Sequence, residues 1–465
     1  MKQGSHTLHP RVLLGTAIAM LALLIAGPAS ASDAECTTLP LLPGAPDQPA
    51  RVQASDAFCA IDFDSNSTAI CSKNWSTSAA ALVYDLSGTE WEDRGAEFER
   101  EVCPMGTHAR DAARSELAVF KHSMNFRDTS GTYAPAIQLY DHLSRWLNAT
   151  VQVPATAELR FNSDWYSARV VEPGLALASQ HASRKMLLAA WQHLATALAN
   201  PGSRDGREFM LDEGDTLWGA ALLFTGRRYG PEINGTRASG WGSGQNYDFQ
   251  HTAPFFALRS DKDLAGAIKE GIYSARTDPK MAQALPADAS PVQVGWWMLE
   301  LLDIVVLDFL LGQQDRIGNI DYQWRWLWLE DGEPRSEPAT SDTPPVDGAV
   351  RLRTTWLNDN DAGIRRAYAN YARKTGMITG LRHFNPDLYQ RLKALAADMA
   401  AQGPIYRAMA GNYHLTSSEL ASIATRVAEL DQTITADCKA GKYRFDLVPS
   451  VILGEAEPPA DVACE

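Results

Sequence analysis

The chain has 465 residues, of which 45% are hydrophobic and 21% charged, a composition typical of folded globular proteins and not of disordered ones. Its formal net charge of −14 argues against binding to nucleic acid or to an anionic membrane, because both require a basic surface. The length is sufficient for about two to three domain-sized units. The sequence carries no signal for an oligomeric state.

Residues 1–31 have the features of a secretory signal peptide. Lys2 and Arg11 precede the apolar run VLLGTAIAMLALLIAG, and the small residues ASA at 29–31 fit a cleavage site. A retained membrane anchor is the alternative, but the run is short for a helix that spans a bilayer. Cleavage would remove two basic residues and no acidic one, so the formal charge would go from −14 to −16 (−14 − 2). We therefore expect a protein exported to the periplasm, the extracellular space or a secretory lumen, with no membrane association after cleavage.

The six cysteines, at positions 36, 59, 71, 103, 438 and 464, all follow the expected cleavage point. An even number of cysteines in an exported chain predicts disulfides, while the pairing stays open. Cys464 is the penultimate residue, which indicates that a disulfide holds the C-terminal tail.

The first part of the chain is expected to be rich in strands. Residues 32–79 contain many Pro, Ser and Asp residues, and we expect an irregular, disulfide-held segment there. Over 80–168, the stretches ELAVFKHSMNF (116–126) and AELRF (157–161) have strand patterns. Between them, APAIQLYDHLSRWLN (134–148) has the spacing of an amphipathic helix.

The second part, 169–465, is expected to be mostly helical. RKMLLAAWQHLATAL (184–198), DTLWGAALLF (215–224) and the buried run WWMLELLDIVVLDFLL (296–311) predict helices. YQWRWLWL (322–329) and AVRLRTTWL (349–357) alternate with period two and predict a pair of strands, joined by an acidic, Pro-rich excursion. The order of elements predicts an α+β fold.

Polar residues gather at the two ends of the predicted strand pair. The stretch LDFLLGQQDRIGNIDYQW (307–324) places Asp315 and Asn319 in a turn before the first strand, and WLNDNDAGI (356–364) places Asp359 after the second. Because a hairpin returns the chain to its starting point, we expect these segments to meet. One carboxylate to orient a hydroxyl, with an amide and a carboxylate to hold a divalent cation, is the equipment of phosphoryl transfer. Asp361 is interpreted as a turn residue.

Phosphoryl transfer also needs a fixed cation near the phosphates. Between residues 32 and 184 the chain has only Lys73 and Lys121. Lys73 lies in the expected irregular segment, whereas Lys121 lies on a predicted strand that precedes a helix. Lys121 is therefore the expected phosphate-binding residue.

These motifs resemble the secretory-pathway branch of the protein-kinase-like superfamily, with its Golgi casein kinases, xylosylkinases and spore-coat-protein-H kinases, and more distantly the phosphoinositide kinases. LDFLLGQQDR and LNDN resemble its catalytic and metal-binding elements, and LAVFK resembles its lysine strand. LSRWLNATVQVPAT and LRHFNPDLYQRLKAL extend the resemblance over roughly residues 115–395. The resemblance implies a bilobal fold with a small strand-rich N-lobe and a larger helical C-lobe. It also implies ATP with Mg²⁺ or Mn²⁺ as cofactors, and transfer of the γ-phosphate to a protein or glycan hydroxyl.

Carried over residue by residue, the resemblance assigns a role to each candidate. Asp315 would be the catalytic base, Asp359 and Asn319 the metal ligands, and Lys121 the residue that contacts the nucleotide phosphates. Asp308, on the buried helix, would accept backbone N–H groups of the catalytic turn and hold it rigid.

The chain departs from the branch in its metal ligands and in the partner of its lysine. Asn319 lies one residue closer to Asp315 than the second ligand does in relatives, which leaves Asp321 as a further candidate. The helix position of the lysine's acidic partner reads Ile137 or Gln138, and Asp141, one turn on, is the candidate substitute.

A third departure concerns the phosphate loop. No Gly-rich loop precedes the lysine strand, and Gly106 is the nearest candidate. Two alternatives to a kinase accordingly stay open. One is a catalytically inactive, kinase-like binding or regulatory protein, and the other is transfer of AMP in place of phosphate on the same fold.

Overall fold

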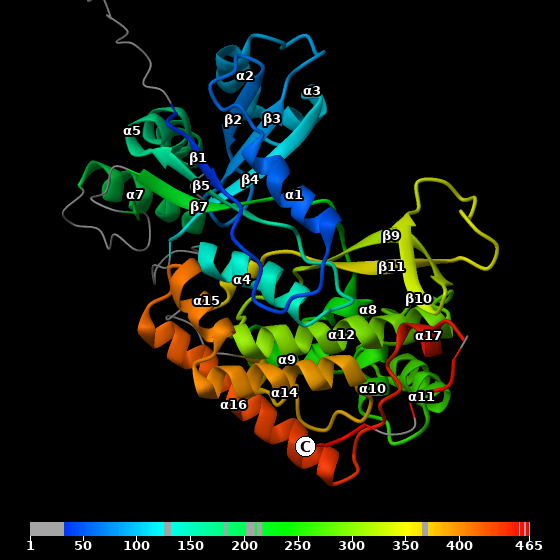
Figure 1. Cartoon of the computed structure of the whole chain (residues 1–465). Helices are drawn as coiled ribbons and strands as arrows, with labels where there is room; N and C mark the ends of the chain where they lie inside the picture. Colours follow the sequence, from blue (N-terminus) through cyan, green and yellow to red (C-terminus); the bar gives the residue numbers. More distant parts are fainter. Residues whose placement is uncertain are drawn as a thin grey trace, which may run out of the picture.

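The computed structural model describes residues 32–124, 132–180, 184–200, 210–211, 216–364, 371–454, 456–459 and 462–464. The expected signal peptide lies outside the described residues. The described chain has an α+β fold in which a sheet-rich part is joined to a larger helical part that carries a second sheet (Figure 1).

The first sheet has seven strands in the order β1-β5-β7-β4-β3-β2, with β6 against β7, and all its pairings are antiparallel. The strands are β1 (Glu35–Thr37), β2 (Thr68–Ser72), β3 (Ala81–Asp85), β4 (Ser115–His122), β5 (Ala157–Asn162), β6 (Met210–Leu211) and β7 (Thr216–Leu222). Strand β4 carries Lys121 and lies between β3 and β7. Lys121 is thus fixed on an interior strand.

Helices cover both faces of this sheet (Figure 1). They are α1 (Pro49–Cys59), α2 (Gly95–Glu101), α3 (His108–Ala112), α4 (Ala134–Trp146), α5 (Ser163–Tyr166), α6 (Glu172–Ser179) and α7 (Lys185–Ala199). Phe120 of β4 packs into the hydrophobic cluster beneath α5 to α7, whereas Val119 packs on the opposite face with Ile137 of α4. Every residue of α4 is buried, because the helix lies between the sheet and the helical part.

Three sequence expectations about the first sheet are wrong. Residues 32–79 are not an irregular lead-in, because β1 and β2 belong to the first sheet. The strand-rich unit does not end at residue 168, because β7 is one of its inner strands. The stretch 215–224 was predicted as a helix, but a short apolar run that is buried on both faces has no periodicity that separates strand from helix.

Gly219 shows why β7 fits beside β4. A Cβ atom at this position would lie 2.4 Å from the backbone oxygen of Lys121, so no larger side chain fits there without displacing the backbone. The two strands pair with Lys121 opposite Ala220 and His122 opposite Gly219.

The second sheet has the order β10-β9-β11, with β8 against β9. Its strands are β8 (Arg227–Arg228), β9 (Ile320–Glu330), β10 (Glu333–Pro338) and β11 (Val350–Leu357). The predicted strand pair is confirmed as β9 and β11. Strand β10, within the Pro-rich excursion, was not predicted.

The helical part is built around α12, which is buried almost throughout (Figure 1). Its helices are α8 (Pro231–Asn234), α9 (Ser243–Phe249), α10 (Ala253–Leu258), α11 (Leu264–Thr277), α12 (Pro291–Leu311), α13 (Tyr371–Lys374), α14 (Pro386–Ala401), α15 (Pro404–Asn412), α16 (Ser417–Lys439) and α17 (Pro449–Ile452). The side chain of Ser290 caps the start of α12, and Gly312, with φ +65°, ends it in the left-handed conformation. The predicted helix at 296–311 is confirmed and begins earlier than expected.

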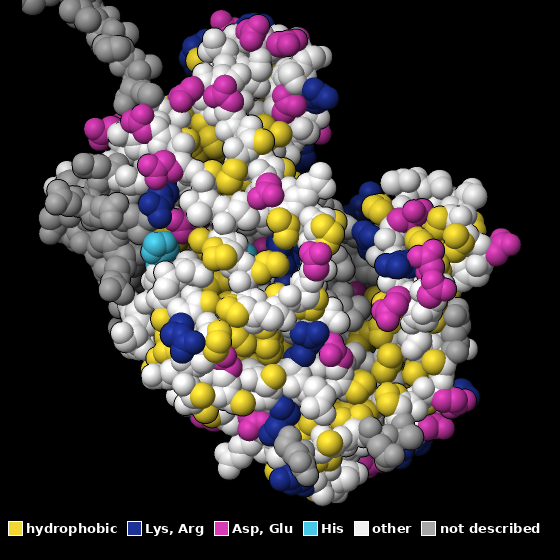
Figure 2. Space-filling view, in the orientation of Figure 1, with side chains coloured by type: hydrophobic (Ala, Val, Ile, Leu, Met, Phe, Trp, Pro, Cys, Tyr) yellow, Lys and Arg dark blue, Asp and Glu magenta, His cyan; other side chains and the backbone are white. Residues whose placement is uncertain are grey.

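Three disulfides join the six cysteines, as Cys36–Cys59, Cys71–Cys103 and Cys438–Cys464. The last confirms that the C-terminal tail is held to α16. Disulfides are typical of exported proteins. Among the described residues, no helix combines the length and the apolar character needed to cross a membrane. Acidic side chains are spread over the tip of the sheet-rich part (Figure 2).

Candidate functional site

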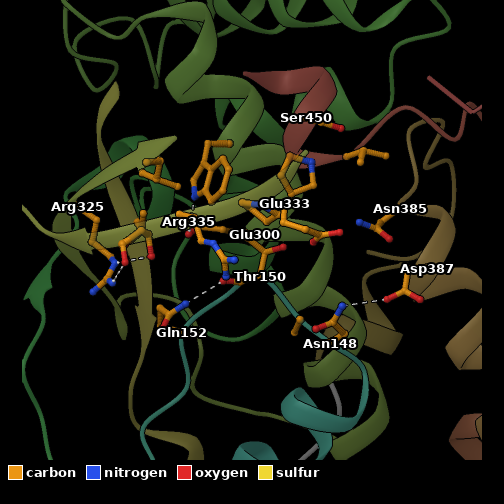
Figure 3. Close-up of a pocket in the computed structure, with 18 of the residues that line it drawn as sticks. Asn148, Thr150, Gln152, Glu300, Arg325, Glu333, Arg335, Asn385, Asp387 and Ser450 are labelled. Carbon is orange, nitrogen blue, oxygen red and sulfur yellow. Dashed lines mark hydrogen bonds between the residues drawn. The ribbon is translucent and has the colours of Figure 1, made fainter. Parts of the chain in front are cut away.

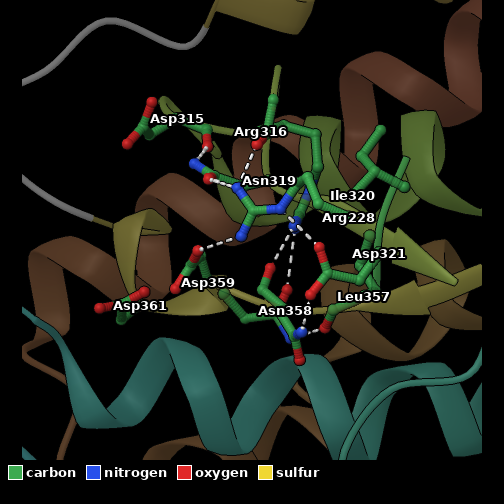
Figure 4. A network of polar contacts seen from close by, with 12 residues as sticks. Arg228, Asp315, Arg316, Asn319, Ile320, Asp321, Leu357, Asn358, Asp359 and Asp361 are labelled. Atoms are coloured by element: carbon green, nitrogen blue, oxygen red, sulfur yellow. Dashed lines mark hydrogen bonds and ion pairs between the residues drawn. The ribbon is translucent and has the colours of Figure 1, made fainter. Parts of the chain in front are cut away.

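The turn after α12 and the turn after β11 lie side by side because of the register of the second sheet. Ile320, at the start of β9, pairs with Leu357, at the end of β11. The polar residues on either side of this pair therefore form one group (Figure 4). The expected meeting of the 315–319 turn with Asp359 is confirmed.

Lys121 of the first sheet contacts this group directly. Its Nζ atom lies 3.2 Å from Oδ1 of Asp359 and 3.0 Å from Oδ2 of Asp361. Burial alone would lower the pKa of Lys121, but Asp361 and Asp359 raise it above its ordinary value. The ammonium group is therefore charged at neutral pH. Asp361, interpreted from the sequence as a turn residue, is a member of the site.

Asp359 has an unusual backbone and a strongly ionised side chain. Its φ angle is +51°, in the left-handed region that few residues other than glycine adopt. Such strained positions are concentrated at functional sites. Burial would raise the pKa of Asp359, but Lys121, Lys73 and Arg228 lower it to about 2.

Asp315 differs from Asp359, because its pKa is raised and not lowered. Within the described residues, no group donates a hydrogen bond to its carboxylate, and the side chain is partly exposed. Burial, followed by repulsion from Asp359 and Asp361, raises the pKa of Asp315 to about 6. The amide of Asn319 donates to the backbone oxygen of Asp315 at 2.6 Å, which fixes the turn. A partner-free carboxylate with a pKa near neutrality is suited to accept a proton.

Arg228, on β8, was not predicted from the sequence, where a short Arg-Arg pair in a polar stretch carries no distinctive signal. Its Nε atom donates to Oδ1 of Asp321 at 2.5 Å, and its Nη1 atom donates to Oδ1 of Asn319 and to the backbone oxygen of Gly318. Its Nη2 atom lies 3.5 Å from Oδ2 of Asp359. One guanidinium group thus contacts all three residues considered as metal ligands (Figure 4).

This arrangement does not fit the divalent cation that the resemblance implies. Arg228 stands between Asn319 and Asp359, and Asp321 is occupied by Arg228 and by the amide of Asn358. In the described part of the chain, no three His, Cys, Asp or Glu side chains are grouped so that they could hold a metal ion.

Lys73 is a second cation of the site that the sequence did not predict. It follows β2 in the turn to β3, and its Nζ atom lies 5.6 Å from the ring centroid of Phe224. The Nζ atom of Lys121 lies 5.0 Å from the same centroid. Burial, together with repulsion from Lys121, lowers the pKa of Lys73 to about 8. Lys73 was set aside because the segment 32–79 was expected to be irregular, whereas β2 places it beside Lys121.

The two helix residues proposed to accompany Lys121 have different surroundings. Gln138 is fully buried, and neither atom of its amide has a hydrogen-bond partner in the described structure. Asp141 is an internal anchor, because its carboxylate pairs with Arg51 and Arg145 and accepts hydrogen bonds from Thr156. The acidic partners of Lys121 are therefore Asp359 and Asp361, not Asp141.

The carboxylate of Asp308 supports the site by binding side chains, whereas the sequence predicted that it would bind backbone N–H groups of the 315–319 turn. Its carboxylate accepts hydrogen bonds from Arg316, at 3.0 Å, and from the hydroxyl of Tyr140, at 2.8 Å. Arg316 in turn donates to the backbone oxygen of Asn358 and to the side chain of Asn360. This buried ion pair links α12, α4 and the segment that carries Asp359.

A cavity of about 540 Å³ lies at the other end of the second sheet, and Lys121, Asp315 and Asp359 are not part of its lining (Figure 3). Glu300 lies in its wall, and burial raises the pKa of this carboxyl group to about 8. Both oxygens of Glu300 are occupied, by the indole of Trp296 and by the backbone and hydroxyl groups of Thr355. Glu300 therefore has a structural role, and the site around Lys121 is the stronger candidate.

No family model matches the chain, and no curated protein matches it significantly.

Proposed function

We propose that the chain is an exported phosphotransferase with a bilobal, kinase-like arrangement, which transfers the γ-phosphate of ATP to a hydroxyl group of a protein or glycan. The observation that carries this proposal is the contact of Lys121 with Asp359 and Asp361 near Asp315, whose carboxylate accepts no hydrogen bond from the described residues. This contact joins residues from the two sheets that are far apart in the sequence. Phosphoryl transfer requires this combination of a fixed cation and a positioned base.

Each group has a role in that reaction. Lys121 and Lys73 hold phosphate oxygens, and the negative charge of the phosphates replaces part of the charge that Asp359 and Asp361 now supply. Asp315 accepts the proton of the acceptor hydroxyl as its oxygen attacks the γ-phosphorus, and ADP leaves. Asn319 keeps Asp315 in place through the backbone of the turn. We assign no step to Mg²⁺ or Mn²⁺, because Arg228 stands between the proposed ligands.

A transfer assay tests the proposal. The mature, disulfide-bonded chain is incubated with ATP labelled in the γ position, with autophosphorylation, casein and a set of oligosaccharides as acceptor readouts. We expect labelled product from the wild type and none from Asp315→Asn. Asp347→Asn is the matched control, since Asp347 is exposed in the excursion between β10 and β11. Equal labelling by wild type and Asp315→Asn would contradict the assigned base.

A nucleotide-binding protein without turnover is the second candidate. The buried amide of Gln138, where active relatives carry an acid, favours it. In that case ATP raises the melting temperature of the chain, but no label is transferred. ATP labelled in the α position identifies AMP transfer, because only that reaction leaves the α-phosphate on the acceptor.

A further inference from the structure

The guanidinium group of Arg228 lies among Asn319, Asp321 and Asp359, where the resemblance to kinases implies a metal ion. Strand β8 pairs with β9 so that Arg228 lies opposite Asp321, and the pairing carries its side chain toward Asn319 and Asp359. The side chain is 47% exposed, so one side of the guanidinium group remains accessible to a ligand. Its contact with Asp359 is the longest of the set, at 3.5 Å.

The balance of charge at the site points in the same direction. The carboxylates near Arg228 already face protein cations: Asp321 pairs with Arg228, and Asp359 and Asp361 share Lys121. Lys73 adds a further positive charge beside them. Divalent cations bind where oxygen ligands are available to them. Here those oxygens face fixed cations that themselves are suited to bind phosphate.

We propose that Arg228 supplies the positive charge that a divalent cation supplies in related chemistry, so that the site binds the phosphates of a nucleotide without Mg²⁺ or Mn²⁺. This inference rests on the proposed function and specifies how its nucleotide is held. With Nε bonded to Asp321 and Nη1 bonded to Asn319, Nη2 is the nitrogen of the guanidinium group that can donate charge-assisted hydrogen bonds to phosphate oxygens. Arg228 keeps its contact with Asp321 and turns its Nη2 group from Asp359 to the phosphate, with Lys121 and Lys73 on the neighbouring oxygens.

The rival interpretation is that Arg228 blocks a metal site and leaves when the metal arrives. The two interpretations predict opposite effects of removing the side chain. As a cation for phosphate, Arg228 is needed for binding in the absence of metal. As a blocking group, its removal strengthens metal-dependent binding.

Calorimetric titration of ATP into the mature, disulfide-bonded chain, in EDTA and separately in MgCl₂ or MnCl₂, distinguishes them. We expect wild type to bind ATP in EDTA and Arg228→Ala to bind roughly tenfold or more weakly, as for the loss of a charge-assisted hydrogen bond to a phosphate. Arg228→Lys keeps the charge but loses the fixed planar donors, and its affinity for ATP should lie between those of wild type and Arg228→Ala. Arg227→Ala is the matched control from the same strand and should bind like wild type. Melting temperatures verify that each variant is folded.

Three results would overturn the inference. They are ATP binding by wild type only when metal is present, unchanged or tighter binding by Arg228→Ala, and stoichiometric Mn²⁺ binding by the nucleotide-free wild type. Metal-dependent binding with intact phosphate transfer would remove this inference and leave the proposed function standing. Absence of ATP binding under every condition would remove both.

Discussion

The two ends of the second sheet differ in how completely their polar groups are paired. At the end where β9 begins, the carboxylate of Asp315 has no hydrogen-bond donor in the described structure, and Arg228 is only loosely engaged with Asp359. Glu300 lies in the wall of the cavity of about 540 Å³ that extends toward the other end, yet both its oxygens are bonded. A cavity and a perturbed pKa are therefore weaker indicators of function here than polar groups left available to a ligand.

Exchanging the carboxylate for an amide at each end gives the largest expected contrast. Asp315→Asn removes the proposed base, and we expect phosphate transfer to fall by at least about a hundredfold, with little change in stability. Glu300→Gln should leave transfer close to that of wild type, because this side chain is distant from the reacting groups. Initial rates of γ-phosphate transfer measure both. Comparable losses in the two variants would remove the distinction between the ends.

Asp308→Ala tests the ion pair that supports the candidate site. It leaves the buried guanidinium of Arg316 without its carboxylate partner, which typically costs about 3–5 kcal/mol of folding free energy. Denaturant unfolding measures the loss. The exposed Asp347, in the excursion between β10 and β11, provides the control variant Asp347→Ala, for which we expect no more than about 0.5 kcal/mol. A loss as small for Asp308→Ala would show that the ion pair is dispensable.

The pH dependence of transfer sharpens the assignment of roles. Asp315, with a pKa of about 6, must be ionised to accept a proton, and Lys73, with a pKa of about 8, must be protonated to bind phosphate. We expect kcat/KM to rise with pH up to about 6 and to fall above about 8. Lys73→Arg should shift the alkaline limb to higher pH and leave the acidic limb in place. An unchanged alkaline limb would exclude Lys73 as its source.

At the other end, pH should affect stability and not transfer. The pKa of Glu300 is about 8 in the folded chain, above its ordinary value of 4.5, so the folded state binds this proton more tightly than the unfolded state. Its contribution to stability is therefore complete below pH 4.5 and is lost as the pH rises through 8. In wild type, the melting temperature should fall by a few degrees as the pH rises over this range, and Glu300→Gln should remove this decrease. If the melting temperature changed equally with pH in wild type and variant, another group would be responsible for the dependence.

The sequence was most informative where the structure is local. The alternation of YQWRWLWL and AVRLRTTWL predicted β9 and β11, and their antiparallel pairing places the turns that carry Asp315 and Asp359 side by side. The interior strand with Lys121 was also predicted, because eight adjacent residues carry its pattern.

The sequence was least informative where a role depends on pairing between distant strands. Lys73 and Arg228 belong to the site because β2 and β8 join their sheets, and nothing in their neighbouring residues specifies those pairings. Asp361 was assigned to a turn because local composition indicates a turn, and its contact with Lys121 forms only across the two sheets. Strand β7 was predicted as a helix because its pattern has no period.

The tight approach of Gly219 to the backbone of Lys121 also restricts which residues can replace this glycine. Neighbouring side chains on a strand point to opposite faces of the sheet. A shift of one residue in the register of β4 against β7 would therefore point the ammonium group of Lys121 into the hydrophobic cluster that contains Phe120. A bulkier residue at 219 would press the strands toward such a slip. The orientation of the Lys121 ammonium group thus depends on the absence of a Cβ atom at Gly219 of β7.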